Sequence, residues 1–179
     1  MNRFGMAKFE KVSFDQWKND MLSSDVGEVY ARFPDSALKQ IYDSIKLPQR
    51  STVGSAGYDF FLPMPMLDIP ANSSVTIPTG IRCYMDNGWV LQIYPRSGHG
   101  FKYGIHLANS VGIIDEDYYN AKNEGHIQVK LVNDSFLKKH IEFGQGDAFC
   151  QGVFIPYGIV IDDKVEAKRT GGFGSTDNK

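Results

Sequence analysis

Glycine and proline interrupt most of this chain at short intervals, and the segments between them are too short for long helices. The sequence of 179 residues contains 18 Gly and 8 Pro. From Gly57 onward the apolar runs are short, rich in β-branched and aromatic residues, and end at turn residues. Strands are predicted at residues 58–62, 74–77, 81–85, 89–94, 127–132, 153–155 and 159–161. Many short strands with such turns predict an all-β sandwich or jelly roll.

The first fifty residues have a helical pattern instead. Ser13 and Gln16 have the spacing of a capping box, and apolar residues then recur on one helical face. A second amphipathic helix is predicted to begin near Asp35 and to stop before Pro48. We expect both apolar faces to pack against the strand-rich part of the chain.

Charge and composition exclude several classes of protein. The net charge is −2, from 19 Lys+Arg and 21 Asp+Glu, which argues against a dedicated nucleic-acid binder. Cys83 and Cys150 are too few for a disulfide scaffold, and they are expected to be buried in a reducing compartment. No run reaches the ~20 apolar residues of a membrane helix, and the N-terminus lacks a secretory signal. We therefore expect a cytoplasmic protein with no membrane partner.

The common metal and phosphate motifs are absent from this sequence. There is no GxxxxGK[ST] loop, no HExxH and no paired CxxC. The four histidines, His99, His106, His126 and His140, do not have the spacing of metal ligands. We interpret them as exposed or packing residues.

A cation and a hydroxyl directly follow the predicted strand at residues 89–94. Arg96, Ser97 and Gly98 supply a fork of N–H donors, a short hydroxyl and a flexible backbone. This combination suits a phosphate or another oxyanion. An arginine that neutralises a nearby loop carboxylate explains the same residues equally well.

Three consecutive carboxylates follow a short apolar run at residues 112–114. If Asp115, Glu116 and Asp117 stay extended, the two aspartates share one face and the glutamate lies on the other. Clustered carboxylates repel one another unless a cation or a water network uses them. Taken alone, the run is more simply interpreted as a solvated turn.

The C-terminal segment 171–176 embeds one aromatic residue among glycines. Glycines are costly to order, so this segment is not expected to build a core. It can close over a ligand instead, with Phe173 stacked on a flat ring and with glycine N–H groups and the Ser175 and Thr176 hydroxyls on phosphates. The alternative is an inert tail.

Five segments in order resemble the motifs of one enzyme family. They are Ser55–Asp59, Pro95–Gly98, Asn109 with Gly112–Tyr118, Gly146–Gln151 and Gly171–Thr176. Together they resemble the trimeric dUTPase family (deoxyuridine 5′-triphosphate nucleotidohydrolases), over about residues 46–176. The resemblance implies a jelly-roll-like β barrel at 46–167 and a homotrimer with active sites at subunit interfaces. A short helical extension at 1–45 would pack on the barrel, and a flexible lid arm at 168–179 would close a neighbour's site.

The resemblance also implies an activity and a role for each site residue. The reaction is hydrolysis of dUTP to dUMP and pyrophosphate with Mg²⁺, which limits uracil in DNA and supplies dUMP for thymidylate synthesis. Asp115 would activate the water that attacks the α-phosphorus, and no protein side chain would be a main metal ligand, since Mg²⁺ is expected on the triphosphate and water. The expected substrate-binding residues are Asn109, Gly112 and Ile114 for uracil; Tyr118 for deoxyribose; Arg96, Ser97, Gly98, Gln151 and Arg169 for phosphates; and Phe173, Gly174, Ser175 and Thr176 in the lid.

Three departures from the family pattern qualify these roles. Residues 119–124 add about five positions after the tyrosine, and Ala148 stands where an arginine is common. Either Lys168 or Arg169 could take the phosphate role of the arginine that precedes the lid phenylalanine. Two alternatives stay open: a dCTP deaminase or bifunctional relative, which would release ammonia from dCTP, and a nucleotide-sensing regulatory binding protein, which would release no pyrophosphate.

Overall fold

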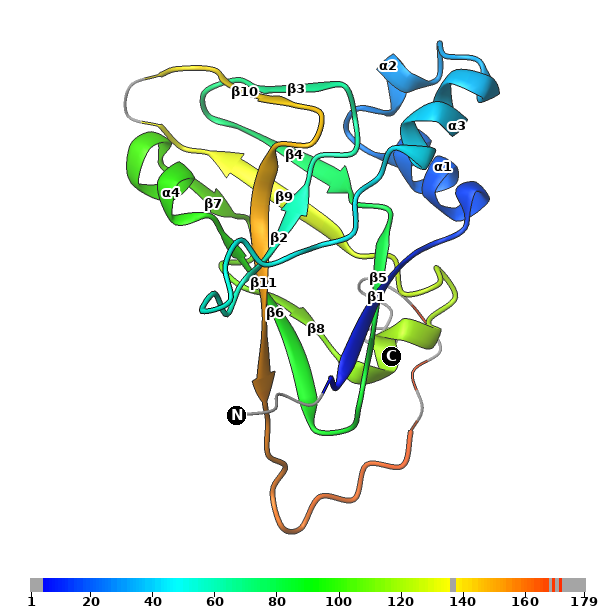
Figure 1. Ribbon diagram of the computed structural model, residues 1–179, viewed down its shortest axis with the longest axis vertical. Coiled ribbons are helices and arrows are strands. Elements are labelled where there is room, and N and C mark those ends of the chain that lie inside the picture. The colour runs from blue at the N-terminus through cyan, green and yellow to red at the C-terminus, as the bar shows by residue number, and fades with distance from the viewer. Residues whose placement is uncertain (1–4, 136–137, 168, 170, 172–179) are drawn as a thin grey trace.

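Short antiparallel strands form the body of the molecule, as Figure 1 shows. The structure is a computed structural model that describes residues 5–135, 138–167, 169 and 171. The strands of this described part are β1 (Ala7–Lys11), β2 (Tyr58–Phe61), β3 (Met66–Ile69), β4 (Ser73–Pro78), β5 (Ile81–Met85), β6 (Trp89–Pro95), β7 (Ile105–Leu107), β8 (Gly112–Ile114), β9 (Gln128–Asn133), β10 (Ile141–Gly144) and β11 (Ala148–Pro156). Its helices are α1 (Phe14–Ser23), α2 (Gly27–Tyr30), α3 (Asp35–Asp43), α4 (Ser97–Tyr103) and the 3₁₀ helix η1 (Glu116–Asn120).

The strands form four small sheets around one apolar core. In the described residues the sheet orders are β2-β11-β6-β8, β4-β9-β7, β1-β5 and β3-β10, and every pairing is antiparallel. Burial alternates along β9, where Val129 and Leu131 face the core and Lys130 faces solvent. This alternation confirms the strand predicted at 127–132. It is the pattern of a sheet with one face on the core and the other exposed to solvent. The arrangement is the expected all-β, jelly-roll-like fold.

The N-terminal segment contributes a strand as well as helices. β1 pairs with β5 over five residues, from Ala7 opposite Met85 to Lys11 opposite Ile81. The sequence analysis did not predict this strand, because Lys8 and Glu10 flank a single aromatic, Phe9, and the run is too short to show a period. Pairing with β5 supplies what the local sequence lacks.

Helices α1 and α3 begin where the sequence analysis placed them. Ser13 is the N-cap of α1, and its hydroxyl accepts a hydrogen bond from the Gln16 backbone N–H at 3.1 Å. The second half of the predicted capping box is wrong, because the Ser13 N–H donates to Glu124 at 2.7 Å and not to Gln16. The four-residue helix α2 was not predicted.

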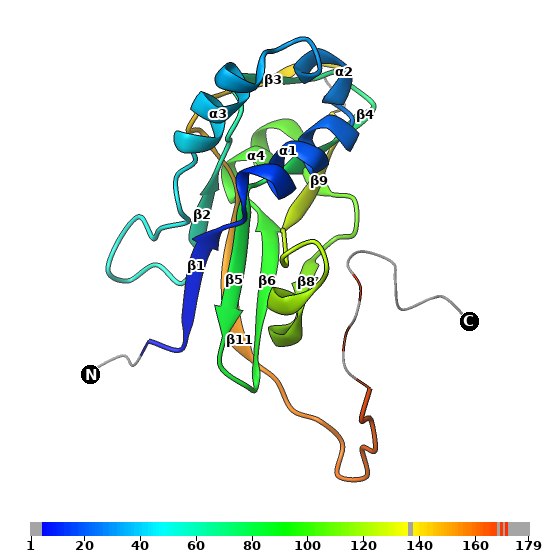
Figure 2. The same ribbon diagram turned by 90° about the vertical axis from the view of Figure 1, so that its right-hand side faces the viewer.

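The helices close one end of the barrel, at the top of Figure 2. Trp17 and Met21 of α1 are fully buried, and Leu38 of α3 is 2% exposed. Their contact surface includes the turn between β4 and β5, where Gly80 has a φ of +75°. A Cβ at Gly80 would lie 2.4 Å from Ile45 Cδ1, so glycine is required there by both conformation and space.

The prediction also differs from the structure at the end of the strand-rich region and at helix α4. Residues 159–161 form no strand; the segment after β11 is extended and leaves the barrel (Figures 1 and 2). Helix α4 was not predicted, because Gly98 and Gly100 disfavour a helix. It ends at Gly104, which has a φ of +70°.

Burial of both cysteines agrees with the sequence analysis. Cys83 is 1% exposed and Cys150 is fully buried, and both are free thiols. Burial raises the pKa of Cys83 to about 12 and raises that of Cys150 as well. Within the described residues, no helix is long and apolar enough to span a membrane.

Candidate active site

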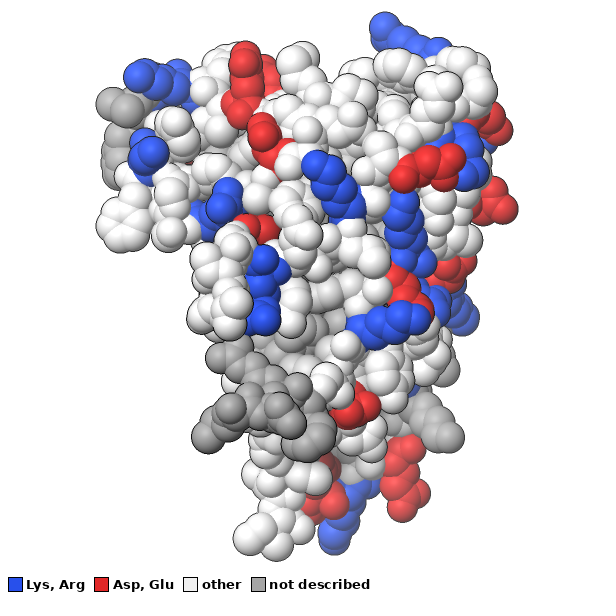
Figure 3. Space-filling view, viewed as in Figure 1, with Lys and Arg blue, Asp and Glu red and all other residues white. Residues whose placement is uncertain are grey.

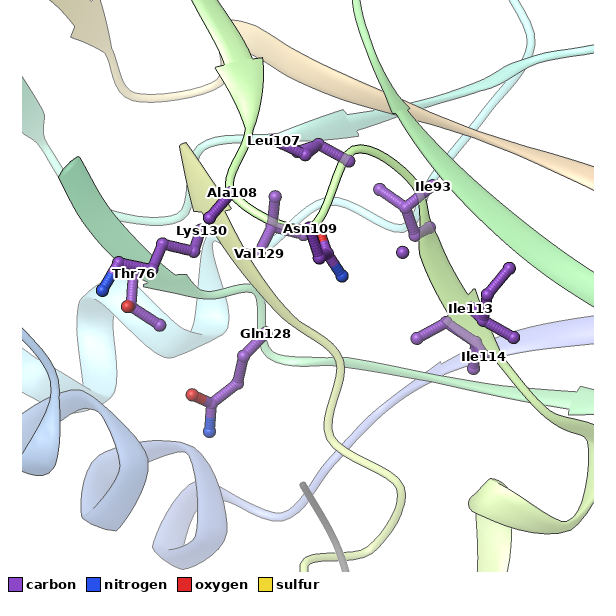
Figure 4. Close-up of a pocket in the computed structure, with 11 residues that line it drawn as sticks. Thr76, Ile93, Leu107, Ala108, Asn109, Ile113, Ile114, Gln128, Val129 and Lys130 are labelled. Carbon is purple, nitrogen blue, oxygen red and sulfur yellow. The ribbon is translucent and has the colours of Figure 1, made fainter. Parts of the chain in front are cut away.

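Three of the predicted site residues line one cavity of about 410 Å³, which we call the Asn109 cavity. Its wall is formed by strands β4, β6, β7, β8 and β9 and by the turn between β7 and β8 (Figure 4). The lining residues are Thr76, Ile93, Leu107, Ala108, Asn109, Gly112, Ile113, Ile114, Gln128, Val129 and Lys130. The cavity is mainly apolar with a few polar groups, which suits a small ligand.

The hairpin of β7 and β8 positions Asn109, Gly112 and Ile114. Figure 4 shows the Asn109 side chain between Val129 and Ile93, on the cavity wall. A Cβ at Gly112 would lie 3.1 Å from Ile93 Cβ, so a side chain at this position would crowd the neighbouring strand. β8 thus presents its backbone close to the cavity, where peptide groups can read the edge of a ligand.

The predicted catalytic carboxylate comes directly after the residues of this cavity. Asp115 is the N-cap of η1, and Glu116 and Asp117 belong to that helix, so the run is a turn of 3₁₀ helix and not an extended strand. The side chains of Asp115 and Asp117 are about half exposed and share one partner. Arg169 Nη2 lies 2.5 Å from Asp115 Oδ2, and Arg169 Nε lies 2.8 Å from Asp117 Oδ1.

Glu116 has a separate partner. Its carboxylate accepts a hydrogen bond from the Gly88 N–H at 2.6 Å. The acidic run is therefore divided between a structural contact and a cation contact. Asp115 and Asp117 together bind one guanidinium, which shows that this turn attracts positive charge.

Tyr118 lies beside the acidic turn and is almost completely buried. Its hydroxyl donates to the His126 carbonyl at 2.9 Å and accepts from Asn123 Nδ2 at 2.8 Å. The guanidinium carbon of Arg169 lies 5.6 Å from the centre of its ring. Burial raises the pKa of Tyr118, so the phenol stays neutral and donates.

A second cavity, of about 810 Å³, contains the other predicted binding residues. We call it the Arg96 cavity; it is lined by residues of β2, β11 and α4, by Arg96 directly after β6, and by residues between 51 and 57. Arg96, Ser97, Gly98 and Gln151 line it, as predicted. The remaining lining residues are Ser51, Ser55, Ala56, Gly57, Asp59, His99, Lys102, Tyr103 and Val153.

Hydrogen bonds and an ion pair orient the polar groups of the Arg96 cavity. Arg96 Nε lies 3.2 Å from Asp59 Oδ1, and Arg96 Nη1 donates to the Ala148 carbonyl at 3.4 Å. Gln151 Nε2 donates to the Pro95 carbonyl at 3.3 Å. The carboxylate interpretation of Arg96 therefore holds in this structure, and the arginine still borders a cavity with Lys102, hydroxyls and amides that suits an anion.

Among the described residues, none lines both cavities, although β6 contributes to the first and the residue directly after β6 contributes to the second. Ile93 contributes to the Asn109 cavity, and Arg96, three residues later, contributes to the Arg96 cavity. In this chain the predicted site residues that the structure describes therefore form three groups: those of the two cavities, and the cluster of Asp115, Tyr118 and Arg169 at η1. Lys168, Phe173, Gly174, Ser175 and Thr176 lie outside the described residues.

The sequence analysis missed several lining residues. Thr76 and Gln128 belong to strands that carried no motif, and no local signal marks them. Lys102 and His99 lie on the unpredicted helix α4. The pKa of His99 is lowered by burial and by Arg96, so this ring favours its neutral form.

Comparison with known proteins identifies the family. The sequence matches the dUTPase family model over residues 43–177, about three quarters of the chain. The chain belongs to the dUTPase family. A deoxyuridine 5′-triphosphate nucleotidohydrolase of Lactococcus lactis subsp. lactis is 43% identical over 135 residues, covering 74% of this chain and 88% of the relative.

Solved dUTPase structures resemble the fold. The dUTPase of Streptococcus mutans has a TM-score of 0.58 at 38% identity and covers 66% of this chain and 90% of its own. A dUTPase of Staphylococcus bacteriophage 80alpha, solved with dUpNHpp, has a TM-score of 0.58 at 16% identity. The match covers 93% of this chain and 100% of the bacteriophage chain. The dUTPase match begins at residue 43, so helices α1 and α2 precede it.

Proposed function

We propose that this protein hydrolyses dUTP to dUMP and pyrophosphate, with Asp115 activating the attacking water. The observation that carries the proposal is the hairpin of β7 and β8, which lines a cavity for a planar base and leads directly into this carboxylate. The family membership of the chain supplies the substrate class. The product dUMP serves thymidylate synthesis, and removal of dUTP keeps uracil out of DNA.

The chemical step requires a positioned base and a charge-neutralised triphosphate. Asp115 accepts a proton from water as the water oxygen bonds to the α-phosphorus. The bond from that phosphorus to the oxygen between the α- and β-phosphorus breaks, and pyrophosphate leaves with that oxygen. A carboxylate is a weak base, so orientation and electrostatics contribute much of the rate. The exposed position of Asp115 leaves room for a water molecule.

Base and sugar selection belong to the Asn109 cavity and Tyr118. The Asn109 amide and the backbone at Gly112 and Ile114 would bind the uracil edge, and the apolar wall would exclude a methyl at carbon 5. A mismatch in hydrogen bonding rejects cytosine strongly, because a buried polar group would be left unpaired. Tyr118 would lie against the deoxyribose and exclude a 2′-hydroxyl.

Phosphate binding belongs to the Arg96 cavity and the C-terminal arm. Arg96 and Ser97 with the Gly98 backbone and Gln151 offer donors to phosphate oxygens. Arg169 would exchange its contacts with the Asp115 and Asp117 carboxylates for contacts with a phosphate, since carboxylates and phosphates are both anions. The arm would supply Phe173 over the uracil and Gly174, Ser175 and Thr176 near the terminal phosphate.

A homotrimer would join the two cavities into complete sites. The Asn109 and Arg96 cavities share no lining residue, and in the proposed trimer one nucleotide would take its base and phosphate contacts from different chains. The arm after β11 supports this assembly, because it exposes Ile159 (74%), Val160 (68%), Ile161 (107%) and Val165 (80%). Such an apolar segment is expected to be covered by a neighbouring subunit.

Magnesium fits this site as an ion carried by the substrate. The Arg96 cavity offers one carboxylate, Asp59, which is paired with Arg96, and the described residues contain no group of three metal-ligating side chains. Mg²⁺ commonly binds through substrate phosphates and water with one or two carboxylates. Bound to the triphosphate, it would neutralise the phosphate charge that repels the attacking water.

The surface and the cysteines agree with a cytoplasmic enzyme that acts on a small molecule. On the face in Figure 3, Lys and Arg are interspersed with Asp and Glu and form no uniform basic surface of the kind that binds nucleic acid. Both cysteines are free thiols, as in a reducing compartment. The proposed partners are dUTP and two further copies of the chain.

A pyrophosphate-release assay with Mg²⁺ across dUTP, dTTP, dCTP and UTP tests this function. We expect release from dUTP alone, and an Asp115→Asn variant should lose ~10²–10⁴-fold in kcat, the usual contribution of a general base. Asp117→Asn is the matched control, because it removes the neighbouring carboxylate on the same arginine and should keep most activity. Ammonia from dCTP would favour a deaminase, and nucleotide binding without any release would favour a regulatory binding protein.

A further inference from the structure

The position of Tyr118 depends on the segment that follows it. Its hydroxyl is hydrogen-bonded to the carbonyl of His126 and to the amide of Asn123, at 2.9 and 2.8 Å. Both partners belong to residues 119–126, which include the additional positions 119–124. The orientation of the Tyr118 ring therefore follows the conformation of this segment, which we call the hairpin segment.

The backbone of the hairpin segment is unfavourable by itself. Glu124 and Gly125 are consecutive left-handed residues, with φ of +58° and +69°. A glutamate in that region is disfavoured by its Cβ. A Cβ at Gly125 would lie 2.6 Å from the Tyr118 carbonyl oxygen, so the turn packs tightly against the tyrosine backbone. Contacts from elsewhere in the chain must stabilise this conformation.

The first such contact comes from the start of helix α1. Glu124 Oε2 accepts the Ser13 N–H at 2.7 Å, and Glu124 Oε1 accepts the Ser13 hydroxyl at 2.6 Å. In a capping box, a glutamate or glutamine three residues into the helix accepts the N–H of the N-cap residue. Here Glu124, from a distant part of the chain, accepts that N–H instead. The helix start and the hairpin segment each satisfy a polar group of the other.

The second contact comes from the middle of the same helix. His126 is fully buried, and its Nδ1 lies 2.5 Å from Asp20 Oδ2. Its Nε2 accepts the Gly80 N–H at 2.8 Å, which assigns the ring proton to Nδ1 and makes His126 the donor to Asp20. Both ring nitrogens of His126 are hydrogen-bonded, one to α1 and the other to the turn between β4 and β5. These bonds fix the position of His126, whose carbonyl accepts the hydrogen bond from Tyr118.

The same helical region also holds two walls of the Asn109 cavity. Asp25, just after α1, accepts the Thr76 N–H at 2.8 Å. The Gln128 side chain lies near Asp20 and helps to lower the pKa of that carboxyl. Both Thr76 and Gln128 line the cavity, and Figure 4 shows Gln128 directed toward the helices. Burial opposes ionisation of Asp20, but hydrogen bonds from His126 and Gln16 outweigh it and hold the pKa of Asp20 below its usual value.

We propose that helix α1 is a positioning element for the nucleotide site, and that Ser13 and Asp20 fix Tyr118 through Glu124 and His126. These residues touch neither the reacting atoms nor the metal; they set how firmly the tyrosine excludes a ribose. The inference rests on the proposed dUTP hydrolysis, because it assigns the sugar discrimination of that reaction to helix α1.

The test compares kcat/KM for dUTP and UTP in Asp20 variants. We expect Asp20→Ala to lower the dUTP-to-UTP ratio by about tenfold, as for the loss of one hydrogen bond to a positioned group, and to raise KM for dUTP more than it lowers kcat. Asp20→Asn keeps an acceptor for His126 and should recover most of the ratio. Lys18→Ala is the matched control on α1, because it removes only an exposed ion pair with Asp35 at 2.6 Å.

A second variant and a second measurement keep the inference testable if Asp20→Ala unfolds. Ser13→Gly retains the backbone N–H and a tolerated helix N-cap but removes the hydroxyl from Glu124. In either variant, amide hydrogen exchange should accelerate over residues 116–126 and stay unchanged in β9. An unchanged dUTP-to-UTP ratio with unchanged exchange in folded variants would overturn the inference. Absence of wild-type activity would instead overturn the proposed function, since hydrogen exchange reports on the link independently of catalysis.

Discussion

Truncation of Trp17 should show how much the helices contribute to the stability of the barrel. Trp17 is fully buried; its ring centre lies 5.9 Å from that of Tyr42, and its Cδ1 lies 3.2 Å from where a Cβ would stand on Gly80. Replacing a buried tryptophan with alanine costs ~3–5 kcal/mol, and the cost rises with the cavity that remains. The cavity would not collapse easily here, because Gly80 is hydrogen-bonded to Val12 and to His126.

We therefore expect Trp17→Ala to lower the free energy of unfolding by about 4 kcal/mol, toward the middle of that range. In a chain of this size, such a loss shifts Tm by roughly 8–16 °C. Urea titration followed by far-ultraviolet circular dichroism measures it, at one fixed chain concentration because subunit association adds to stability.

Val29→Ala on α2 is the matched control for that experiment. Val29 is 58% exposed, so its truncation should change stability by no more than about 0.5 kcal/mol. A loss below ~1 kcal/mol for Trp17→Ala would refute the reasoning, since it would mean that the helices do not share the core of the barrel.

Three further predictions concern single groups. Gly57→Ala should raise KM for dUTP several-fold with little loss of stability, because the new Cβ would lie 2.5 Å from Gln151 Oε1 and displace that amide; steady-state kinetics measure it, and an unchanged KM would argue against phosphate binding by Gln151. The pKa of Glu10 is lowered to about 2, chiefly by its hydrogen bond to Lys8, so its contribution to stability is complete above pH 4.5 and is lost as pH falls toward 2. Glu10→Gln should therefore make the free energy of unfolding less dependent on pH between pH 4.5 and 2. The same pH dependence in Glu10→Gln and the wild type would contradict the assignment. Cys83, with a pKa of about 12, should react with a thiol reagent only after denaturation, and fast labelling of the native protein would show that its burial is wrong.

The strands that could be predicted from sequence are those whose local pattern and burial agree. Residues 128–133 alternate between core and solvent, and the turn at Gly80 separates β4 from β5 as its sequence predicts. β1 could not be predicted, because its five residues gain their stability from pairing with β5. Residues 159–161 have a strand pattern but find no partner strand within the described part of one chain.

The site could be predicted as a set of residues but not as an arrangement. Asn109, Gly112 and Ile114 do line one cavity, and Arg96 with Gln151 line another, as their chemistry suggested. Their division between two cavities follows from the order of strands around β6, which no local pattern encodes.

The support from helix α1 could not be predicted either. Ser13 and Glu124 are 111 residues apart in the chain, and Asp20 and His126 are 106 apart. Each residue looks ordinary in its own segment: a helix N-cap, a helix carboxylate, a loop glutamate and a packing histidine. Only the packing of the helices on the barrel brings them together.

The position of the new phosphorus–oxygen bond tests the central claim most directly. Hydrolysis of dUTP in water carrying a heavy oxygen isotope, followed by mass spectrometry of both products, identifies the phosphorus that water attacks. The account predicts that the heavy oxygen appears in dUMP, because the water beside Asp115 strikes the α-phosphorus. Heavy oxygen in the pyrophosphate, with none in dUMP, would contradict it.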